Sequence, residues 1–254
     1  MLRRIIPVLL VKGKGLVKGT NFRNHRYVGD PINTVKIFND KEVDELIVLD
    51  IQATKENRCI DYKLVRKLAD ECYMPFAVGG GINNINQIRT LIREGAEKVV
   101  LNSVLANNLD LVRAASERFG SQSIVACIDL NKNWFGKTIL YSHNYTKKIS
   151  NDLISWMRKL ESLGAGEIII NCIHKDGIME GYDSSIISAI NSKISIPTII
   201  LGGAGSYDDL RKAFSNSDLS AVASGSLFVF HGELKAVLIN YPSKTEKKKI
   251  TGVN

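Results

Sequence analysis

Residues 74–81 read MPFAVGGG, and residues 196–203, roughly 122 positions further along the chain, read IPTIILGG. Each stretch is a short apolar run that ends in glycines, a pattern typical of a buried strand followed by a tight turn. The same spacing relates residues 44–50, DELIVLD, to residues 166–172, GEIIINC. The sequence therefore predicts two similar halves, each built from four strand–helix units.

Short apolar runs and amphipathic stretches of helical period alternate along the chain. This alternation predicts parallel strands covered by helices, and the duplicated halves favour a single α/β fold, the (β/α)8 TIM barrel, over an open doubly wound sheet. We expect one domain over residues 1–254, with half-barrels at about 1–122 and 123–243 and a basic tail at 244–254. The expected strands are 5–11, 46–51, 76–78, 99–101, 124–128, 168–170, 198–201 and 221–223, and expected helices include 62–72, 85–94, 109–119, 153–163, 184–191 and 207–214, with Asp61, Asn84 and Ser206 as N-caps.

The composition suits one large domain with an anionic partner. The chain has 254 residues, of which 44% are hydrophobic, and barrels of this class commonly run to about 250 residues. Its net charge of +8 favours phosphorylated metabolites, nucleic acid or an acidic protein face. No nucleic-acid recognition motif is present, so we expect no nucleic-acid partner. The lysine-rich segment 244–249 is interpreted as a solvated terminus.

The four cysteines, at positions 59, 72, 127 and 172, show no CxxC spacing. We therefore expect no metal site, no disulfide framework and no cofactor, and a reducing cytoplasm as the compartment. Residues 3–11 mimic the start of a signal peptide, but the apolar run is short and Lys12 follows it, so a buried strand explains it better. No apolar stretch approaches the roughly 20 residues that span a bilayer, so we expect no membrane association.

Glycine runs at 79–81 and 202–205 each follow an expected strand and precede an expected helix. Backbone N–H groups at such positions can approach an anion without obstruction by Cβ atoms. Small polar residues at 102–103 and 224–226 end the next strand in each half and could complete two phosphate cradles. The alternative to phosphate binding is that these glycines only form tight turns. Because the glycine runs occur at matching positions in both halves, we favour a ligand with two phosphates.

These segments resemble a known family. The stretches LVKGT at 16–20, VGDP at 28–31, VGGGI at 78–82, GAGEI at 164–168 and GGAG at 202–205 resemble the cyclase subunit of imidazole glycerol phosphate synthase, in order and in nearly the family spacing. The resemblance extends from about residue 3 to about residue 240. Within the family, the chain looks most similar to the paralogues that lack the catalytic aspartate on the first strand.

The resemblance implies an enzyme subunit of histidine biosynthesis that works as a heterodimer with a glutaminase. The glutaminase would dock on the N-terminal face of the barrel, and ammonia would pass through the barrel to the opposite face. There a lyase and cyclase reaction would convert a phosphoribulosyl aminoimidazole carboxamide ribonucleotide, which is a bisphosphate, to imidazole glycerol phosphate and the released carboxamide ribonucleotide.

Residue by residue, the resemblance assigns both ends of the barrel. Among the substrate-binding and phosphate-binding positions it implies are Lys18, Asp50, Gly80, Gly81, Asn102 and Ser103, and, toward the second phosphate, Asp176, Gly177, Gly202, Gly203, Gly225 and Ser226. At the ammonia entrance it implies a ring of Arg4, Glu45, Lys98 and Glu167, with Gln122 facing the glutaminase. Any one of these charges could be an ordinary solvated strand end, but two acids and two bases can form a mutually paired ring.

The main departure concerns proton transfer, which cyclisation requires from a general acid and a general base. The family uses two aspartates, and the one on the fifth strand is here as Asp129. Leu10 stands where the other belongs, and losing such a group commonly removes a factor of about 10² to 10⁴ in rate. His174 replaces a usual acidic residue and is interpreted as a surface or supporting histidine rather than a substitute acid or base. Trp134 and Phe135 are expected in an excursion after the fifth strand, where they cap the ligand or pack the loop.

Three functions remain open at this point. The first is the synthase subunit itself, with proton transfer weakened or altered by Leu10. The second is an ammonia-conduit subunit, because the chain looks similar to relatives with an altered first strand that accompany amidotransferases building acetamidino groups on surface-polysaccharide (O-antigen) sugars. The third, the related single-chain isomerase of the pathway, is disfavoured by the four entrance residues and by GAGE at 164–167.

Overall fold

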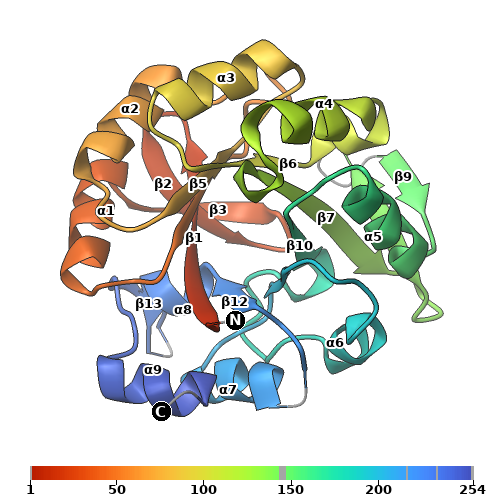
Figure 1. The fold of residues 1–254 in the computed structure, drawn as a ribbon. Helices are drawn as coiled ribbons and strands as arrows, with labels where there is room; N and C mark the ends of the chain where they lie inside the picture. The colour runs from red at the N-terminus through yellow and green to blue at the C-terminus, as the bar shows by residue number, and fades with distance from the viewer. Residues whose placement is uncertain (1, 143–146, 216, 233, 253–254) are drawn as a thin grey trace.

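Eight parallel strands close into a barrel in the computed structural model, which describes residues 2–142, 147–215, 217–232 and 234–252 (Figure 1). Strand β1 pairs with both β12 and β4, and β7 pairs with both β6 and β10, so the sheet has no free edge along this ring. The expected α/β TIM barrel is confirmed. The eight strands are β1 (Arg4–Lys12), β4 (Leu46–Asp50), β5 (Phe76–Gly79), β6 (Lys98–Leu101), β7 (Ile124–Lys132), β10 (Glu167–Cys172), β11 (Thr198–Leu201) and β12 (Ala221–Ser224).

Helices cover the outside of the barrel. The six expected helices are present, and Asp61 and Asn84 accept hydrogen bonds from backbone N–H groups as N-caps. A further helix, α1, opens at Pro31 with Asp30 as its cap. The helices are α1 (Pro31–Asp40), α2 (Tyr62–Glu71), α3 (Ile85–Arg93), α4 (Asp110–Phe119), α5 (Leu153–Ser162), α6 (Ser184–Ile190), α7 (Tyr207–Ser215), α8 (Ser226–Val229) and α9 (Lys244–Thr251), with 3-10 turns η1 (Ser103–Ala106), η2 (Ser121–Ser123) and η3 (Ile173–Lys175).

Antiparallel additions extend two of the barrel strands. The β1 strand continues into β2 (Gly15–Thr20) and β3 (Arg23–Gly29), and β7 continues into β8 (Thr138–Ser142) and β9 (Lys147–Ser150). A small separate hairpin, β13 (Phe230–His231) with β14 (Ala236–Val237), precedes α9. Since β2–β3 and β8–β9 follow the C-terminal ends of β1 and β7, both lie at the end of the barrel where the site is expected.

The apolar residues form two separate clusters, one inside the barrel and one between the strands and the helices. Alternation along each strand decides which cluster a residue joins. On β1, Ile6 and Val8 belong to the interior cluster, whereas Ile5 and Leu9 pack toward the helices. The interior between the two ends of the barrel is therefore lined mainly by apolar side chains. None of the helices in the described part of the chain is long and apolar enough to cross a membrane.

The lysine-rich segment 244–249 is exposed at every position except Lys247, as interpreted from the sequence, but it is helical and anchored to the barrel. The segment forms α9, which carries a capping box between Ser243 and Glu246, buries Ile250 and packs against α7. Lys247 pairs with Asp44, and Arg3 donates to the carbonyl of Thr251 at 3.0 Å. The sequence did not indicate this helix because the residues that anchor it lie more than two hundred positions away along the chain.

Tyr241 anchors the start of this segment, and removing its hydroxyl should destabilise the fold. The buried hydroxyl donates to the carbonyl of Ile5 at 2.8 Å and accepts from the backbone N–H of Asp44 at 3.3 Å. We expect Tyr241→Phe to lower the free energy of unfolding by about 1–3 kcal/mol, because buried backbone groups lose their partner. Urea denaturation measures this, and Tyr73→Phe, at a side chain 88% exposed, serves as the control that should change little. Equal stability of the two variants would contradict the anchoring role.

Candidate functional site

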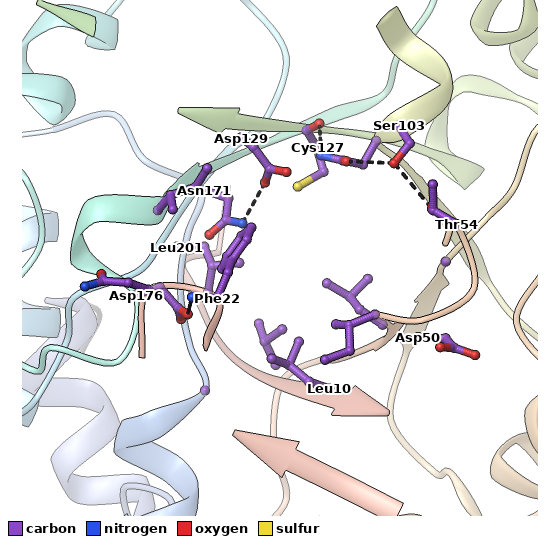
Figure 2. Close-up of a pocket in the computed structure, with 18 of the residues that line it drawn as sticks. Leu10, Phe22, Asp50, Thr54, Ser103, Cys127, Asp129, Asn171, Asp176 and Leu201 are labelled. Atoms are coloured by element: carbon purple, nitrogen blue, oxygen red, sulfur yellow. Dashed lines mark hydrogen bonds between the residues drawn. The ribbon is translucent and has the colours of Figure 1, made fainter. Parts of the chain in front are cut away.

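A cavity of about 750 Å³ opens at the C-terminal end of the barrel (Figure 2). Residues from the ends of β1, β4, β5, β6, β7, β10 and β11 line it, together with the β2–β3 hairpin. Eleven positions singled out from the sequence lie in its wall, namely Leu10, Lys18, Asp50, Gly80, Gly81, Asn102, Ser103, Asp129, His174, Asp176 and Gly225. Gly177, Gly202, Gly203 and Ser226 do not line the cavity itself.

On the first-half side, glycines lie against the turn that follows β4. Gly81 has φ +64°, and a Cβ there would lie 1.8 Å from the carbonyl oxygen of Arg58, so a side chain is excluded. The hydroxyl of Ser103 lies 3.3 Å from that of Thr54, and both line the cavity. A small anion would meet backbone and two hydroxyls here, which fits the first predicted cradle.

On the second-half side, Gly203 lies against the carbonyl of Gly181, where a Cβ would come within 2.3 Å. Gly225 precedes Ser226 at the end of β12, and the hydroxyl of Ser226 is buried without a hydrogen-bond partner among the described residues. An unpaired buried hydroxyl is unfavourable unless something satisfies it. Neither Ser226 nor Gly203 reaches the cavity wall, so the second predicted phosphate site stays a prediction.

Two of the three cavity carboxylates are already neutralised by cations. Asp50 accepts from the backbone N–H groups of Gln52 and Ala53 at 2.9 and 3.1 Å and pairs with Arg58 at 2.6 Å, which fixes the turn after β4. Asp176 pairs with Lys18 and accepts from the backbone N–H of Phe22. Asp50 and Asp176 therefore stabilise the walls.

Asp129 is the third carboxylate, and in the described part of the chain no cation pairs with it. It is buried on β7 and accepts from the side chain of Asn171 at 2.7 Å. Burial raises the pKa of Asp129 to about 6, with the amides of Asn171 and Asn102 opposing the rise. A carboxyl with this pKa can both hold and release a proton near neutral pH.

Across the cavity from Asp129, Leu10 projects from β1 (Figure 2). Leu10 is in register with Leu49 on the neighbouring strand, just as Asp129 is in register with Asn171 on the opposite side. The cavity wall opposite Asp129 is therefore apolar at this position. Among the described residues, the other carboxylates that line the cavity are Asp50 and Asp176, and both are paired with cations.

His174 lies in the cavity wall and is held from behind by Asp183. Its Nε2 lies 2.8 Å from the carboxylate of Asp183, which also pairs with Lys132 at 2.5 Å. Burial acts to raise the pKa of Asp183, but hydrogen bonds from Lys132, Ser185 and His174 hold it well below its ordinary value. Asp183 is also the N-cap of α6, and Lys132 is the last residue of β7, so the ion pair between them links β7 to α6. A supporting role for His174 fits this geometry.

Trp134 and Phe135 lie in the turn between β7 and β8, and their side chains are 98% and 84% exposed. Neither lines the cavity. The structure therefore brings them neither over the site nor into the packing of their own loop.

At the N-terminal end of the barrel, the four predicted entrance residues form a closed ring of ion pairs. Lys98 pairs with Glu45 at 2.7 Å and with Glu167 at 3.0 Å, and Arg4 pairs with both glutamates. Burial tends to lower the pKa of Arg4, but Glu167 and Glu45 outweigh it and raise the pKa. Each charge meets two of opposite sign, which compensates for its desolvation.

A second hollow, of about 610 Å³, lies outside this ring. Gln122 lines it, and so do Lys247 and Lys248 of α9. The ring and the large cavity thus occupy opposite ends of one barrel interior. In the described residues, no three histidine, cysteine, aspartate or glutamate side chains gather as a possible metal site.

Asn171 and Thr54 are site residues that the sequence analysis missed. Asn171 is the last residue but one of β10, at the position where the first half has Leu49, so a polar residue near the end of a buried strand was the available signal. Thr54 lies in a turn with no motif, and only the fold brings it beside Ser103.

Residues 4–235 match the protein family described as histidine biosynthesis protein. The chain belongs to this family. It is 47% identical over 251 residues to a protein of Vibrio vulnificus provisionally named imidazole glycerol phosphate synthase subunit hisF3, covering 98% of this chain and 96% of the relative. It is 45% identical to the provisionally named subunit hisF2 of Pseudomonas aeruginosa, covering 94% and 96%.

The imidazole glycerol phosphate synthase subunit HisF of Streptococcus sanguinis is 37% identical over 226 residues, covering 89% of this chain and 90% of the relative. The resemblance to this type of subunit, found from the sequence motifs, is confirmed by these near full-length matches.

The raised pKa of Asp129 predicts a pH-dependent cost in stability. A carboxyl with a pKa of 3.8 when unfolded and about 6 when folded destabilises the native state as pH rises through that window. We therefore expect Asp129→Asn to increase the free energy of unfolding at pH 7 by roughly 1–3 kcal/mol, with most of the gain absent at pH 4. Urea denaturation across this range measures it. Asp110→Asn, at an exposed carboxylate, should show no such dependence, and a gain independent of pH at Asp129 would contradict the assignment.

Proposed function

We propose that this chain is the ammonia-accepting synthase subunit of a glutamine amidotransferase of the imidazole glycerol phosphate synthase type. The observation that carries the proposal is the alignment of three parts on the same strands. The paired ring of charges lies at one end, the apolar interior lies in the middle, and the cavity with Asp129 lies at the other end. An enzyme that receives ammonia from a separate subunit needs an entrance, a dry path and a reaction site in this order.

The partner in this proposal is a glutaminase that docks over Arg4, Glu45, Lys98, Glu167 and Gln122. The hollow outside the ring gives it a concave, basic-rimmed surface with Lys247 and Lys248. The names of the relatives, as subunits of a synthase, support a heteromeric complex.

The substrate in this proposal is a bisphosphate, the phosphoribulosyl aminoimidazole carboxamide ribonucleotide, converted to imidazole glycerol phosphate and the free carboxamide ribonucleotide. Glycines and hydroxyls on both halves of the barrel support two phosphate sites. Lys18 reaches the cavity wall and packs on Gly225, and a phosphate on the second side would have to share this cation with Asp176.

Proton transfer in this reaction falls to Asp129 alone. Ring closure needs one group to accept a proton and another to donate one, and Leu10 can do neither. Asp129 would have to exchange its proton with water or substrate between steps. We therefore place the activity well below that of an enzyme with two aspartates.

A second function is favoured by one specific observation, the combination of a complete ring at one end of the barrel with the apolar Leu10 at the other end. A subunit that only conducts ammonia needs the entrance but no second carboxylate. In that case the barrel would supply ammonia to the formation of acetamidino groups on surface-polysaccharide sugars, with a different protein binding the acceptor.

Reversing one charge of the ring should uncouple glutamine hydrolysis from ammonia use. Lys98→Glu would leave three carboxylates around Arg4, and repulsion among buried like charges should open the ring. We expect product formed per glutamine hydrolysed to fall, while activity with added ammonium persists. The ratio of product to glutamate measures this in the reconstituted complex. Lys98→Arg is the matched control, and coupling in Lys98→Glu equal to that of the parent would show that the ring is not the entrance.

Restoring the carboxylate at position 10 distinguishes the two functions. With saturating ammonium and the bisphosphate substrate, we expect slow turnover in the parent and a rise of about 10² or more in Leu10→Asp, the usual scale for one acid–base group. Steady-state product formation measures it, and Leu10→Asn is the control of similar size that cannot transfer a proton. Parent turnover equal to that of an enzyme with both aspartates would refute the assignment of Leu10. Failure of Leu10→Asp to gain activity would favour the conduit function.

A further inference from the structure

The last inward-facing residues of the barrel divide the cavity floor into two arcs. Leu201 of β11, Leu10 of β1 and Leu49 of β4 form an apolar arc on consecutive sides of the ring, with Ala223 of β12 between Leu201 and Leu10. The opposite, polar arc contains Asn102, Asp129 and Asn171, from the ends of β6, β7 and β10. Figure 2 shows Leu10 and Asp129 facing each other across this floor.

The apolar arc is continuous with the interior core. Leu10 and Leu49 both pack against the interior cluster, which contains Ile6, Val8 and Ile47 on the same two strands. On β1 the inward positions run from Arg4 in the ring through Ile6 and Val8 to Leu10, so the apolar lining reaches the cavity without interruption. With a carboxylate at position 10, the apolar lining on β1 would end at Val8.

We propose that Leu10 is a specificity-determining residue of the exit, completing an apolar lining that delivers ammonia to Asp129 as uncharged NH3 and excludes ammonium and water. The proposal rests on the proposed ammonia path and goes beyond it, because it gives Leu10 a function of its own. An uncharged amine enters an apolar lining at small cost, whereas an unpaired ammonium ion loses its hydration without compensation.

Cys127 provides a built-in probe of this exit. It lies two residues before Asp129 on the same face of β7, is 5% exposed, and belongs to the interior cluster while lining the cavity. Burial, with the nearby charge of Asp129, raises the pKa of its thiol well above the ordinary value. Cys59 and Cys72 lie outside the barrel interior and serve as internal references.

The test measures how a neutral and a cationic thiol reagent reach Cys127. The purified chain, without glutaminase or substrate, is treated with methyl methanethiosulfonate or with its trimethylammonium-ethyl analogue, and labelling at each cysteine is followed by peptide mass spectrometry. The variants are Leu10→Asn and its matched apolar control Leu10→Met, which conserves volume and polarity. Leu49→Asn tests the neighbouring residue of the arc, and thermal unfolding checks that each variant is folded.

In the parent and in Leu10→Met, we expect Cys127 to react with the neutral reagent much faster than with the cation. In Leu10→Asn and Leu49→Asn we expect this preference to fall by about tenfold or more, because a polar side chain admits water and charge into the lining. The preference at Cys59 and Cys72 should not change. Equal preference in Leu10→Asn and Leu10→Met would overturn the proposal. Absence of turnover with ammonium in every variant would instead overturn the proposed reaction, and the labelling ratio would still decide the role of Leu10.

Discussion

Neighbouring residues of a strand point to opposite faces, so closing eight parallel strands into a barrel sends every second side chain into one shared interior. Arg4, Ile6, Val8 and Leu10 follow one another along that interior from a single strand. The same geometry stacks a layer of charge, layers of apolar side chains and a final mixed layer around the axis. Both ends of the proposed ammonia path depend on this stacking.

The two ends treat buried charge in different ways. At the N-terminal end, Lys98 and its three ring partners neutralise one another, so the ring can remain charged although largely removed from water. At the C-terminal end, Asp129 has amide partners and no cation in the described part of the chain, and burial leaves its pKa near 6. The charges of the N-terminal end therefore stabilise one another. The buried carboxyl of Asp129 at the C-terminal end is suited to proton transfer, but it lowers the stability of the fold when it is ionised.

The two halves of the barrel share a frame but differ at the cavity floor. Both halves contribute glycine turns in which a Cβ would collide with backbone atoms. The polar pair Asp129 and Asn171 has an apolar counterpart, Leu10 and Leu49, at the corresponding strands of the other half. The floor of the cavity is therefore asymmetric on a frame of two similar halves, so residues of the floor can differ while the strands and glycine turns stay alike.

The sequence by itself determined the eight strands and the barrel, because periodicity, glycine turns and an internal repeat can be seen without coordinates; the four members of the ring and the place of Leu10 came from the resemblance to a known family. It could not show that the lysine-rich segment folds as α9, since the contacts to Arg3 and Asp44 come from the other end of the chain. Nor could it show that Asp50 forms an ion pair with Arg58 and Asp176 with Lys18. It also could not show that Asn171 and Thr54 belong to the site. Those outcomes depend on which side chains approach within hydrogen-bonding distance across the barrel, and only the tertiary structure decides that.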